Sequence, residues 1–158
     1  MKTTMGTIEI ELDAKNAPIT VENFLNYVNS DYYNGTVFHR VIDNFMIQGG
    51  GFTSDGKQKE TNAPINLESQ NGLGNKLGTI AMARTNVPNS ATSQFFINVK
   101  DNDFLNWSPG NPGYAVFGKV ISGMDVVNEI KSIATTVKNR MQDWPAEDVT
   151  ILKIFLKD

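Results

Sequence analysis

The sequence contains no cysteine and a single histidine among its 158 residues. The absence of cysteine excludes disulfide bonds, thiolate-ligated zinc, iron–sulfur clusters and a catalytic thiol. One histidine leaves little capacity for a metal site, so we expect neither a metal nor another cofactor. The sequence also lacks an apolar segment long enough to cross a bilayer or to act as a secretory signal, which predicts a cytoplasmic protein without membrane contact.

Positive charge is scarce as well, since the chain has 14 basic and 17 acidic side chains and a formal net charge of −3. This balance argues against a nucleic-acid partner, which normally requires a basic surface. Hydrophobic residues make up 40% of the chain and charged residues 20%, as in ordinary globular proteins. With no repeat or linker in sight, we expect one domain over residues 1–158 that acts as a monomer.

Short segments rich in aromatic or β-branched residues predict a mainly β protein. Apolar and polar residues alternate over 8–12, as in a half-buried strand. Two segments have helical spacing instead: residues 21–28, with Thr20 as the predicted N-cap, and residues 124–132. The other predicted strands are 36–42, 44–48, 78–82, 94–99, 114–120 and 149–156. Many short strands separated by turn residues indicate a sandwich or closed barrel with two helices.

Two local motifs resemble ligand-binding loops but are incomplete. Residues 51–57 have the glycine and lysine spacing of a P-loop, yet Gln58 stands where the magnesium-binding hydroxyl belongs. Asp101 and Asp103 begin like a calcium loop, yet Leu105 occupies a position that requires an oxygen ligand. We interpret both segments as surface turns.

A polar interruption of an apolar strand indicates a functional site. Arg40 shares the alternating phase of Phe38 and Ile42, and burial of an arginine is costly unless it is paired or faces a cleft. Two interpretations are open: a buried ion pair with a distant carboxylate, or a cation on a pocket floor that Gln48 orients. The neighbouring His39 lacks an accompanying nucleophile motif, so we interpret it as structural rather than as a general base.

Four longer motifs resemble the signatures of cyclophilins, in the same order and with matching separations. They are FHRVIDNFMIQGGGF at 38–52, GTIAMA at 78–83, SQFFI at 93–97 and VFGKV at 116–120. The similarity extends over the whole chain, and MART at 82–85 with DNDFLNW at 101–107 is most similar to the cytosolic bacterial branch. The resemblance implies an all-β fold: a closed eight-stranded antiparallel barrel capped by two α-helices, with the active site on its outer face.

The same resemblance implies a peptidyl-prolyl cis–trans isomerase that acts on X–Pro bonds in peptides and in unfolded or folding proteins. Arg40 matches the family's catalytic arginine, and Gln48 matches the glutamine that positions it. The matching substrate-binding positions are Phe45, Met46, Ala83, Arg84, Gln94, Phe96, Phe104, Leu105 and Tyr114. Among them, four residues match the proline-ring pocket: Phe45, Met46, Phe96 and Leu105. The backbone at residues 83–84 matches the segment that binds the residues before the proline.

Three of these positions depart from residues common in the family. Phe104 aligns with a tryptophan and Tyr114 with a histidine that many members have, although Trp107 could supply an indole instead. Arg84 replaces a common asparagine. Because Arg40 and the proline pocket are retained, we expect isomerase activity, with cyclosporin binding weakened by the loss of the tryptophan.

Rotation of a prolyl bond suits a chain with few reactive groups, because no bond breaks. Amide resonance creates a barrier of roughly 18–20 kcal/mol. An arginine can lower it by donating a hydrogen bond to the nitrogen that loses conjugation in the twisted transition state. The alternative is a non-catalytic proline-peptide-binding or chaperone module that uses the same groove. A barrel that encloses a small ligand is a third hypothesis, favoured only by the all-β pattern.

Overall fold

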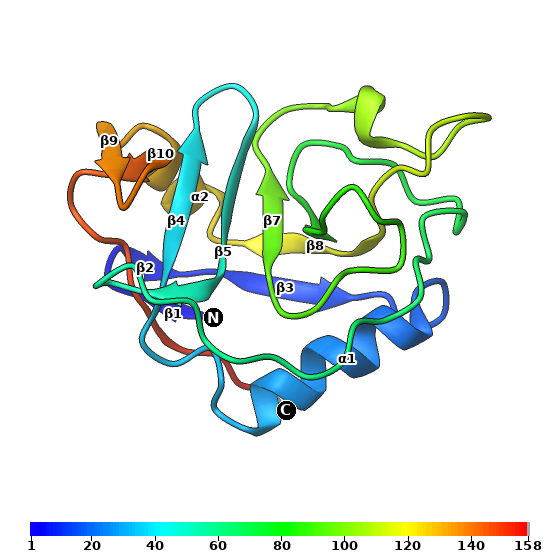
Figure 1. Cartoon of the computed structure of the whole chain (residues 1–158), viewed down its shortest axis with the longest axis horizontal. Helices are drawn as coiled ribbons and strands as arrows, with labels where there is room; N and C mark the ends of the chain where they lie inside the picture. The colour runs from blue at the N-terminus through cyan, green and yellow to red at the C-terminus, as the bar shows by residue number, and fades with distance from the viewer. Residues whose placement is uncertain (158) are drawn as a thin grey trace.

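A six-stranded antiparallel sheet dominates the computed structural model, which describes residues 1–157 (Figure 1). Its strands lie in the order β3-β8-β6-β7-β5-β4. Their bounds are β3 Glu9–Leu12, β4 Thr36–Ile42, β5 Met46–Thr53, β6 Thr79–Met82, β7 Phe95–Asn98 and β8 Val116–Ser122. The predicted mainly β class is therefore confirmed, and most predicted strands lie within a few residues of their observed positions.

Two smaller sheets accompany the large one. One has the order β11-β1-β2, and the other is the hairpin β9–β10. The bounds are β1 Lys2–Thr3, β2 Gly6–Thr7, β9 Thr135–Lys138, β10 Met141–Pro145 and β11 Ile151–Lys153. In the part of the chain that the structure describes, the strands thus form separate sheets, and the predicted closed eight-stranded barrel is not confirmed. The predicted strand at 149–156 is also shortened to three residues.

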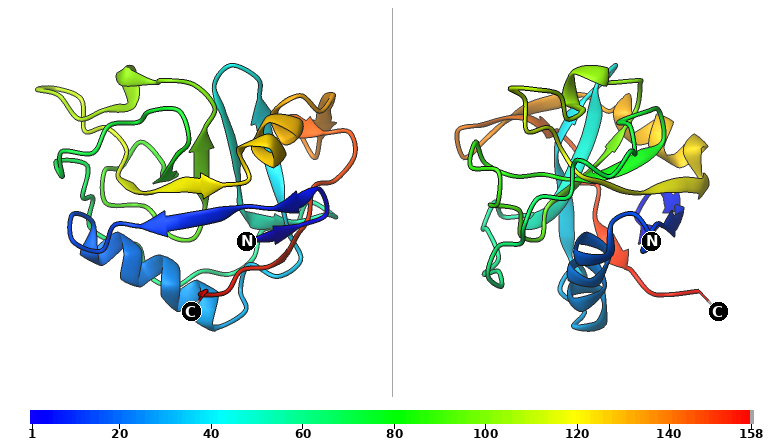
Figure 2. Two further views of the ribbon diagram at one scale, coloured as in Figure 1. Left: turned by 180° about the vertical axis from the view of Figure 1, so that it is seen from behind. Right: turned by 90° about the vertical axis from the view of Figure 1, so that its right-hand side faces the viewer.

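The core lies between the sheets and two α-helices, α1 Pro18–Asn29 and α2 Met124–Lys131 (Figure 2). The ring of Phe24 on α1 lies 5.8 Å from that of Phe95 on β7 and 5.3 Å from that of Phe117 on β8. Because buried rings fill the interior, the hypothesis of a barrel that encloses a ligand loses its support. No helix within residues 1–157 has both the length and the apolar composition that a membrane span requires.

Helix α1 begins before its predicted start and is capped from a distant segment. Pro18 occupies the first turn and Ala17 the N-cap position, without a side-chain cap. The prediction of Thr20 as N-cap is wrong because Thr20 lies inside the helix. Its backbone N–H donates to the Glu68 carboxylate at 2.6 Å, as does the N–H of Ile19 at 3.3 Å. Glu68 therefore satisfies N–H groups that helices leave unpaired at their start.

A bulge in β4 determines which face of the sheet its side chains occupy. Phe38 pairs with Gly49 and Arg40 pairs with Gln48, and these two partners are consecutive residues of β5. His39, between Phe38 and Arg40, is therefore an extra residue on β4. A bulge of this kind shifts the alternation of side chains between the two faces. Phe38 therefore points into the main core, whereas Ile42 packs on the opposite face and Arg40 is exposed. The prediction that Phe38 shares its phase with Arg40 and Ile42 is wrong.

Candidate active site

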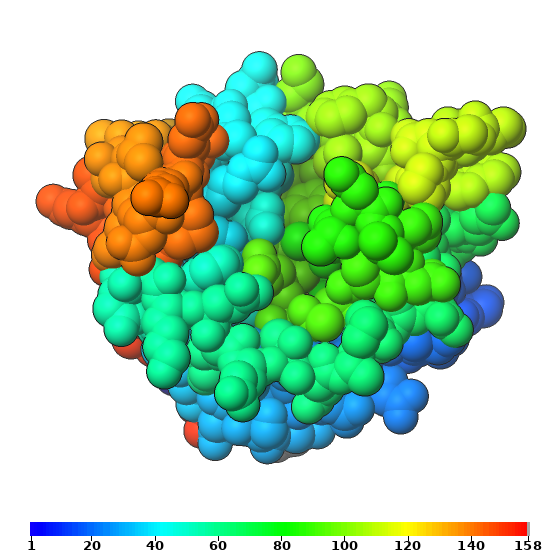
Figure 3. Space-filling view, viewed as in Figure 1, coloured from blue at the N-terminus to red at the C-terminus, as the bar shows by residue number. Residues whose placement is uncertain are grey.

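A pocket of about 140 Å³ opens on the outer face of the six-stranded sheet. It is lined by Arg40, Phe45, Met46, Gln48, Ala83, Arg84, Phe96, Leu105 and Tyr114. In Figure 3, the cyan surface of β4 and β5 and the green surface that follows β6 border a recess. Nine of the eleven predicted site residues thus line the pocket, from segments that are far apart in the sequence, and Gln94 and Phe104 each contact one of the lining residues.

The pocket floor is a second apolar cluster, separate from the main core. Met46, Ala81, Phe96 and Val116 are buried there, together with Leu105 of the 3₁₀ helix η1 (Asp103–Leu105). Their neighbours along the strands point into the main core, as expected because successive side chains of a strand face opposite sides of the sheet. The six-stranded sheet therefore has apolar residues on both faces, and the outer ones can hold a small apolar group.

Arg40 stands beside this floor as an exposed cation. None of the ion pairs among residues 1–157 includes Arg40. Of the two interpretations open at the sequence level, the buried ion pair is wrong, and the cation that faces a cleft matches the structure. Gln48 is the cross-strand partner of Arg40 and also lines the pocket, and its role in orienting Arg40 stays a prediction.

Gln94 does not line the pocket but is hydrogen-bonded to Gln48, which does. The Nε2 group of Gln48 donates a hydrogen bond to Oε1 of Gln94 at 3.0 Å. The Gln94 side chain in turn lies against Gly51, where an added Cβ would be 2.5 Å from Gln94 Cγ. Gly51 is therefore a site-supporting residue that the sequence reasoning missed. The run of three glycines at 49–51 was the available signal, because such a run allows other groups to approach the backbone closely.

Arg84 forms part of the opposite wall. Its Nε and Nη2 groups donate to the carbonyl oxygen of Gly113 at 3.1 and 2.6 Å, and Nη1 donates to that of Thr85 at 2.8 Å. Its guanidinium carbon lies 4.4 Å from the centre of the Tyr114 ring, which meets Phe96 edge-on at 5.7 Å. Arg84 is thus stacked and hydrogen-bonded into one orientation.

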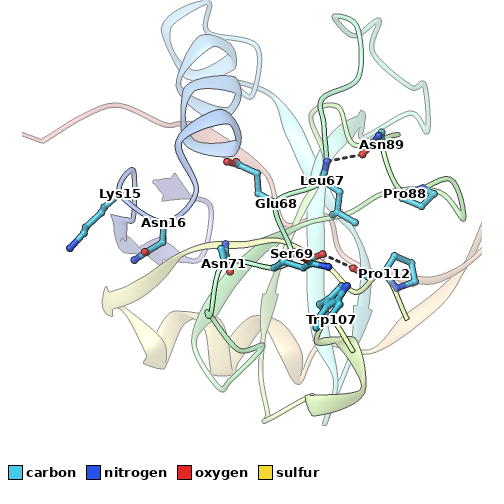
Figure 4. A pocket seen from close by; sticks show the side chains of 11 residues that line it. Lys15, Asn16, Leu67, Glu68, Ser69, Asn71, Pro88, Asn89, Trp107 and Pro112 are labelled. Carbon is cyan, nitrogen blue, oxygen red and sulfur yellow. Dashed lines mark hydrogen bonds between the residues drawn. The ribbon is translucent and has the colours of Figure 1, made fainter. Parts of the chain in front are cut away.

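Phe104, and not Trp107, lies at the rim of the pocket. The Phe104 ring stacks on Phe45 at 5.7 Å and is 65% exposed. Trp107 lines a different hollow of about 630 Å³, together with Leu67 and Pro112 (Figure 4). Several polar groups of that hollow already have partners in the chain, such as the N–H of Leu67 and the hydroxyl of Ser69.

His39, the residue before Arg40, is buried. Its ring centre lies 4.6 Å from that of Phe52 and 5.9 Å from that of Trp144, and its Nδ1 atom has no hydrogen-bond partner among the described residues. Burial, together with the smaller effect of the adjacent Arg40 charge, lowers the pKa of His39 to about 4. His39 is therefore neutral at pH 7, which agrees with a structural role.

This burial predicts that the protein loses stability when the pH falls from 7 to 5. The unfolded chain binds a proton at His39 near pH 6.5, whereas the folded chain does so only near pH 4. The contribution of neutral His39 to the free energy of unfolding is therefore fully present above pH 6.5. About 2 kcal/mol of this free energy is lost by pH 5. Denaturant unfolding at several pH values measures this change. His39 is the only histidine, so a His39→Phe variant should lose this part of the pH dependence; an unchanged slope would contradict the prediction.

The pocket and the residues at its border indicate which kind of group this site can bind. An apolar pocket of this size, bordered by Arg40 and by the segment that follows β6, can hold a small apolar ring. No cluster of three acidic or histidine side chains among residues 1–157 is arranged to bind a metal ion. The fold and the site therefore define a mainly β protein with a small apolar surface pocket and cationic groups at its border.

Comparison with known proteins identifies the family. Residues 1–155 match the family described as cyclophilin type peptidyl-prolyl cis-trans isomerase/CLD. The chain is 57% identical over 157 residues to a peptidyl-prolyl cis-trans isomerase of Acinetobacter baylyi, covering 99% of this chain and 84% of that protein. It is 53% identical over 159 residues to peptidyl-prolyl cis-trans isomerase B of Escherichia coli, with 99% and 97% covered.

A solved structure agrees with these sequence relatives. The cyclophilin-type isomerase of Cryptosporidium parvum, determined in the presence of the dipeptide Ala-Pro, superposes with a TM-score of 0.81 at 27% identity. The superposition covers 100% of this chain and 97% of that one. The chain thus belongs to the cyclophilin-type peptidyl-prolyl cis–trans isomerases, and the predicted resemblance and enzyme class are confirmed.

Proposed function

We propose that the outer pocket holds the proline ring of an X–Pro peptide while Arg40 accelerates rotation about the prolyl bond. The observation that supports this assignment is the position of Arg40, an exposed arginine that forms no ion pair with residues 1–157, at the edge of an apolar pocket of about 140 Å³. X–Pro peptides and unfolded or folding chains that expose such bonds are the substrates of this site.

The chemistry follows from the electronic structure of the amide. In the planar ground state, the nitrogen lone pair is delocalised into the carbonyl group and is a poor hydrogen-bond acceptor. In the twisted transition state the lone pair is localised on nitrogen, and the Arg40 guanidinium donates a hydrogen bond to it. An interaction that is strong only in the transition state raises the rate. A charge-assisted bond of about 1.5–3 kcal/mol gives roughly a ten- to hundredfold acceleration.

Orientation of the arginine is the role we assign to Gln48 and Gln94. Because the Gln48 amide nitrogen donates to Gln94, its carbonyl oxygen is left as the acceptor for the Arg40 guanidinium. The Arg40 side chain has several rotatable bonds. Because a fixed acceptor restricts it before the reaction, less conformational entropy is lost when it binds the transition state. Gln94 therefore acts on catalysis through Gln48, without contacting the substrate ring.

The remaining residues anchor the substrate. Phe45, Met46, Phe96 and Leu105 hold the proline ring, with Phe104 and Tyr114 at the borders of the pocket. The chain at Ala83–Arg84 continues beyond the end of β6, and its backbone binds the residues that precede the proline. With both sides held, rotation about a single bond is the motion left to the substrate.

A peptide titration followed by NMR tests this assignment of the pocket. Addition of an Ala-Pro peptide should shift the backbone amide signals of Phe96 and Leu105 and the side-chain signals of Arg40. The indole N–H of Trp107 should not shift, because Trp107 lines the other hollow. Exchange between the cis and trans peptide signals should also accelerate. Shifts centred on Trp107, with those of Phe96 unchanged, would contradict the proposal.

We also propose that the two larger sheets act together as the closed barrel predicted from the sequence. Hydrogen bonds join their edges: the N–H of Phe38 donates to Val149 O at 3.0 Å and that of Gly35 donates to Ile151 O at 2.8 Å. At the other edge, β2 and β3 are separated only by Ile8, whose N–H donates to Met1 O. A single domain over residues 1–158, a monomeric state, a cytoplasmic location and weak cyclosporin binding stay predictions from the sequence.

A further inference from the structure

The charges at the active-site pocket differ in sign from the charge of the whole protein. The chain has a formal net charge of −3 and three arginines, and two of these, Arg40 and Arg84, line the pocket. No aspartate or glutamate is among the lining residues. None of the ion pairs within residues 1–157 includes either arginine. The pocket is therefore a positively charged region on an acidic protein.

Arg84 is oriented for recognition by its contacts with the pocket wall. The carbonyl oxygen of Gly113 that holds it is itself fixed, since Gly113 has a φ of +66° and an added Cβ would lie 2.4 Å from Trp107 N. The Tyr114 ring lies against the guanidinium and restricts its movement. The three groups that donate to carbonyl oxygens use three of the five N–H bonds of the guanidinium, which leaves two for a ligand.

From this geometry we infer that Arg84 makes the enzyme prefer substrates with a carboxylate side chain within the two residues before the proline. The inference rests on the proposed function, in which the backbone at Ala83–Arg84 binds those residues. A planar guanidinium recognises carboxylates with two parallel hydrogen bonds, and a pre-oriented one loses little conformational freedom on binding. Arg40 adds positive charge to the same groove, and no acidic lining residue competes for the substrate carboxylate.

Peptides that differ only in charge test this preference. Matched peptides carry Glu, Gln or Lys directly before the proline, or one position earlier, and kcat/KM is measured by exchange NMR. For the wild-type enzyme at low salt, we expect the Glu peptide to exceed the Gln peptide by about threefold to fivefold at one of these positions, and the Lys peptide to be the poorest. The difference should appear in KM and should shrink in 1 M salt, where the screening length is only about 3 Å.

Two arginine variants separate the local effect from the overall charge. Arg84→Gln should make the Glu and Gln peptides equivalent. Arg140→Gln, which makes the same change in net charge at the exposed turn between β9 and β10, should keep the preference for Glu. Equal kcat/KM for Glu and Gln peptides in the wild type, or an unchanged preference in Arg84→Gln, would overturn the inference. Absence of isomerisation with every peptide would overturn the proposed function instead.

Discussion

Replacement of Arg40 by alanine should lower kcat/KM for X–Pro isomerisation by roughly ten- to a hundredfold, the loss of one charge-assisted hydrogen bond in the transition state. Because Arg40 is exposed and makes no ion pair with the described residues, the free energy of unfolding should change by less than about 0.5 kcal/mol. Exchange NMR with a proline peptide measures the activity, and denaturant unfolding measures the stability.

Two variants make the Arg40 result specific. Arg40→Lys should also be poor, because an ammonium group cannot reproduce the planar fork of N–H donors. Arg140→Ala, at an exposed arginine that does not line the pocket, should retain wild-type turnover. Near wild-type activity of Arg40→Ala would contradict the assigned role. If that variant also prevented aggregation of unfolded chains as well as the wild type, a binding or chaperone role of the groove would be separable from catalysis.

Replacement of Trp144 by alanine should destabilise the fold by about 3–5 kcal/mol, as expected for removal of a large buried aromatic side chain. Trp144 on β10 is 1% exposed, packs against His39 at a tilt and meets Phe52 edge-on, and donates its indole N–H to the Asp148 carboxylate at 3.1 Å. This loss is a large part of the 5–15 kcal/mol that usually stabilises a domain. Denaturant unfolding followed by circular dichroism measures it without relying on tryptophan fluorescence.

The second tryptophan is a matched control. Trp107 is 43% exposed and lies in the hollow beside Pro112. Trp107→Ala should therefore cost much less stability than Trp144→Ala. Similar losses for the two variants would contradict the packing described for β10. Trp144→Phe, which keeps an aromatic ring next to His39, should recover part of the lost stability.

The bulge in β4 shows why strand periodicity predicted the location of the site but not its geometry. The motif around Arg40 predicted a polar interruption in a buried strand, and that strand has the predicted bounds. Periodicity alone assigned Arg40 to the face of Phe38. One extra residue in the pairing reverses the phase, and its presence depends on the register with β5, which a single segment does not encode.

The hairpin β9–β10 was missed for a related reason. The side chains of β9 are mostly exposed, so its sequence lacks the apolar alternation on which strand prediction depends. Its turn uses Asn139 and Arg140, both with positive φ, and not the Asn-Gly or Asp-Gly pair typical of such turns. The hairpin nevertheless places Trp144 against His39 of β4, the residue next to Arg40.

Most of the pocket could be predicted because the family motifs contain its residues. The supporting contacts could not, since they join distant segments. Gly51 accommodates the Gln94 side chain, and Glu68 caps helix α1 from a loop 48 residues away from Thr20. Such contacts depend on tertiary packing and leave no periodic signal in the sequence.

The rate of cis–trans exchange of a peptide bound to the enzyme tests the central claim most directly. With saturating peptide, exchange NMR separates this rate from the dissociation constant. If Arg40 acts mainly in the twisted state, Arg40→Ala should slow the bound exchange by about ten- to a hundredfold and change the dissociation constant by less than about threefold. A weakened affinity with an unchanged exchange rate on the enzyme would contradict the account.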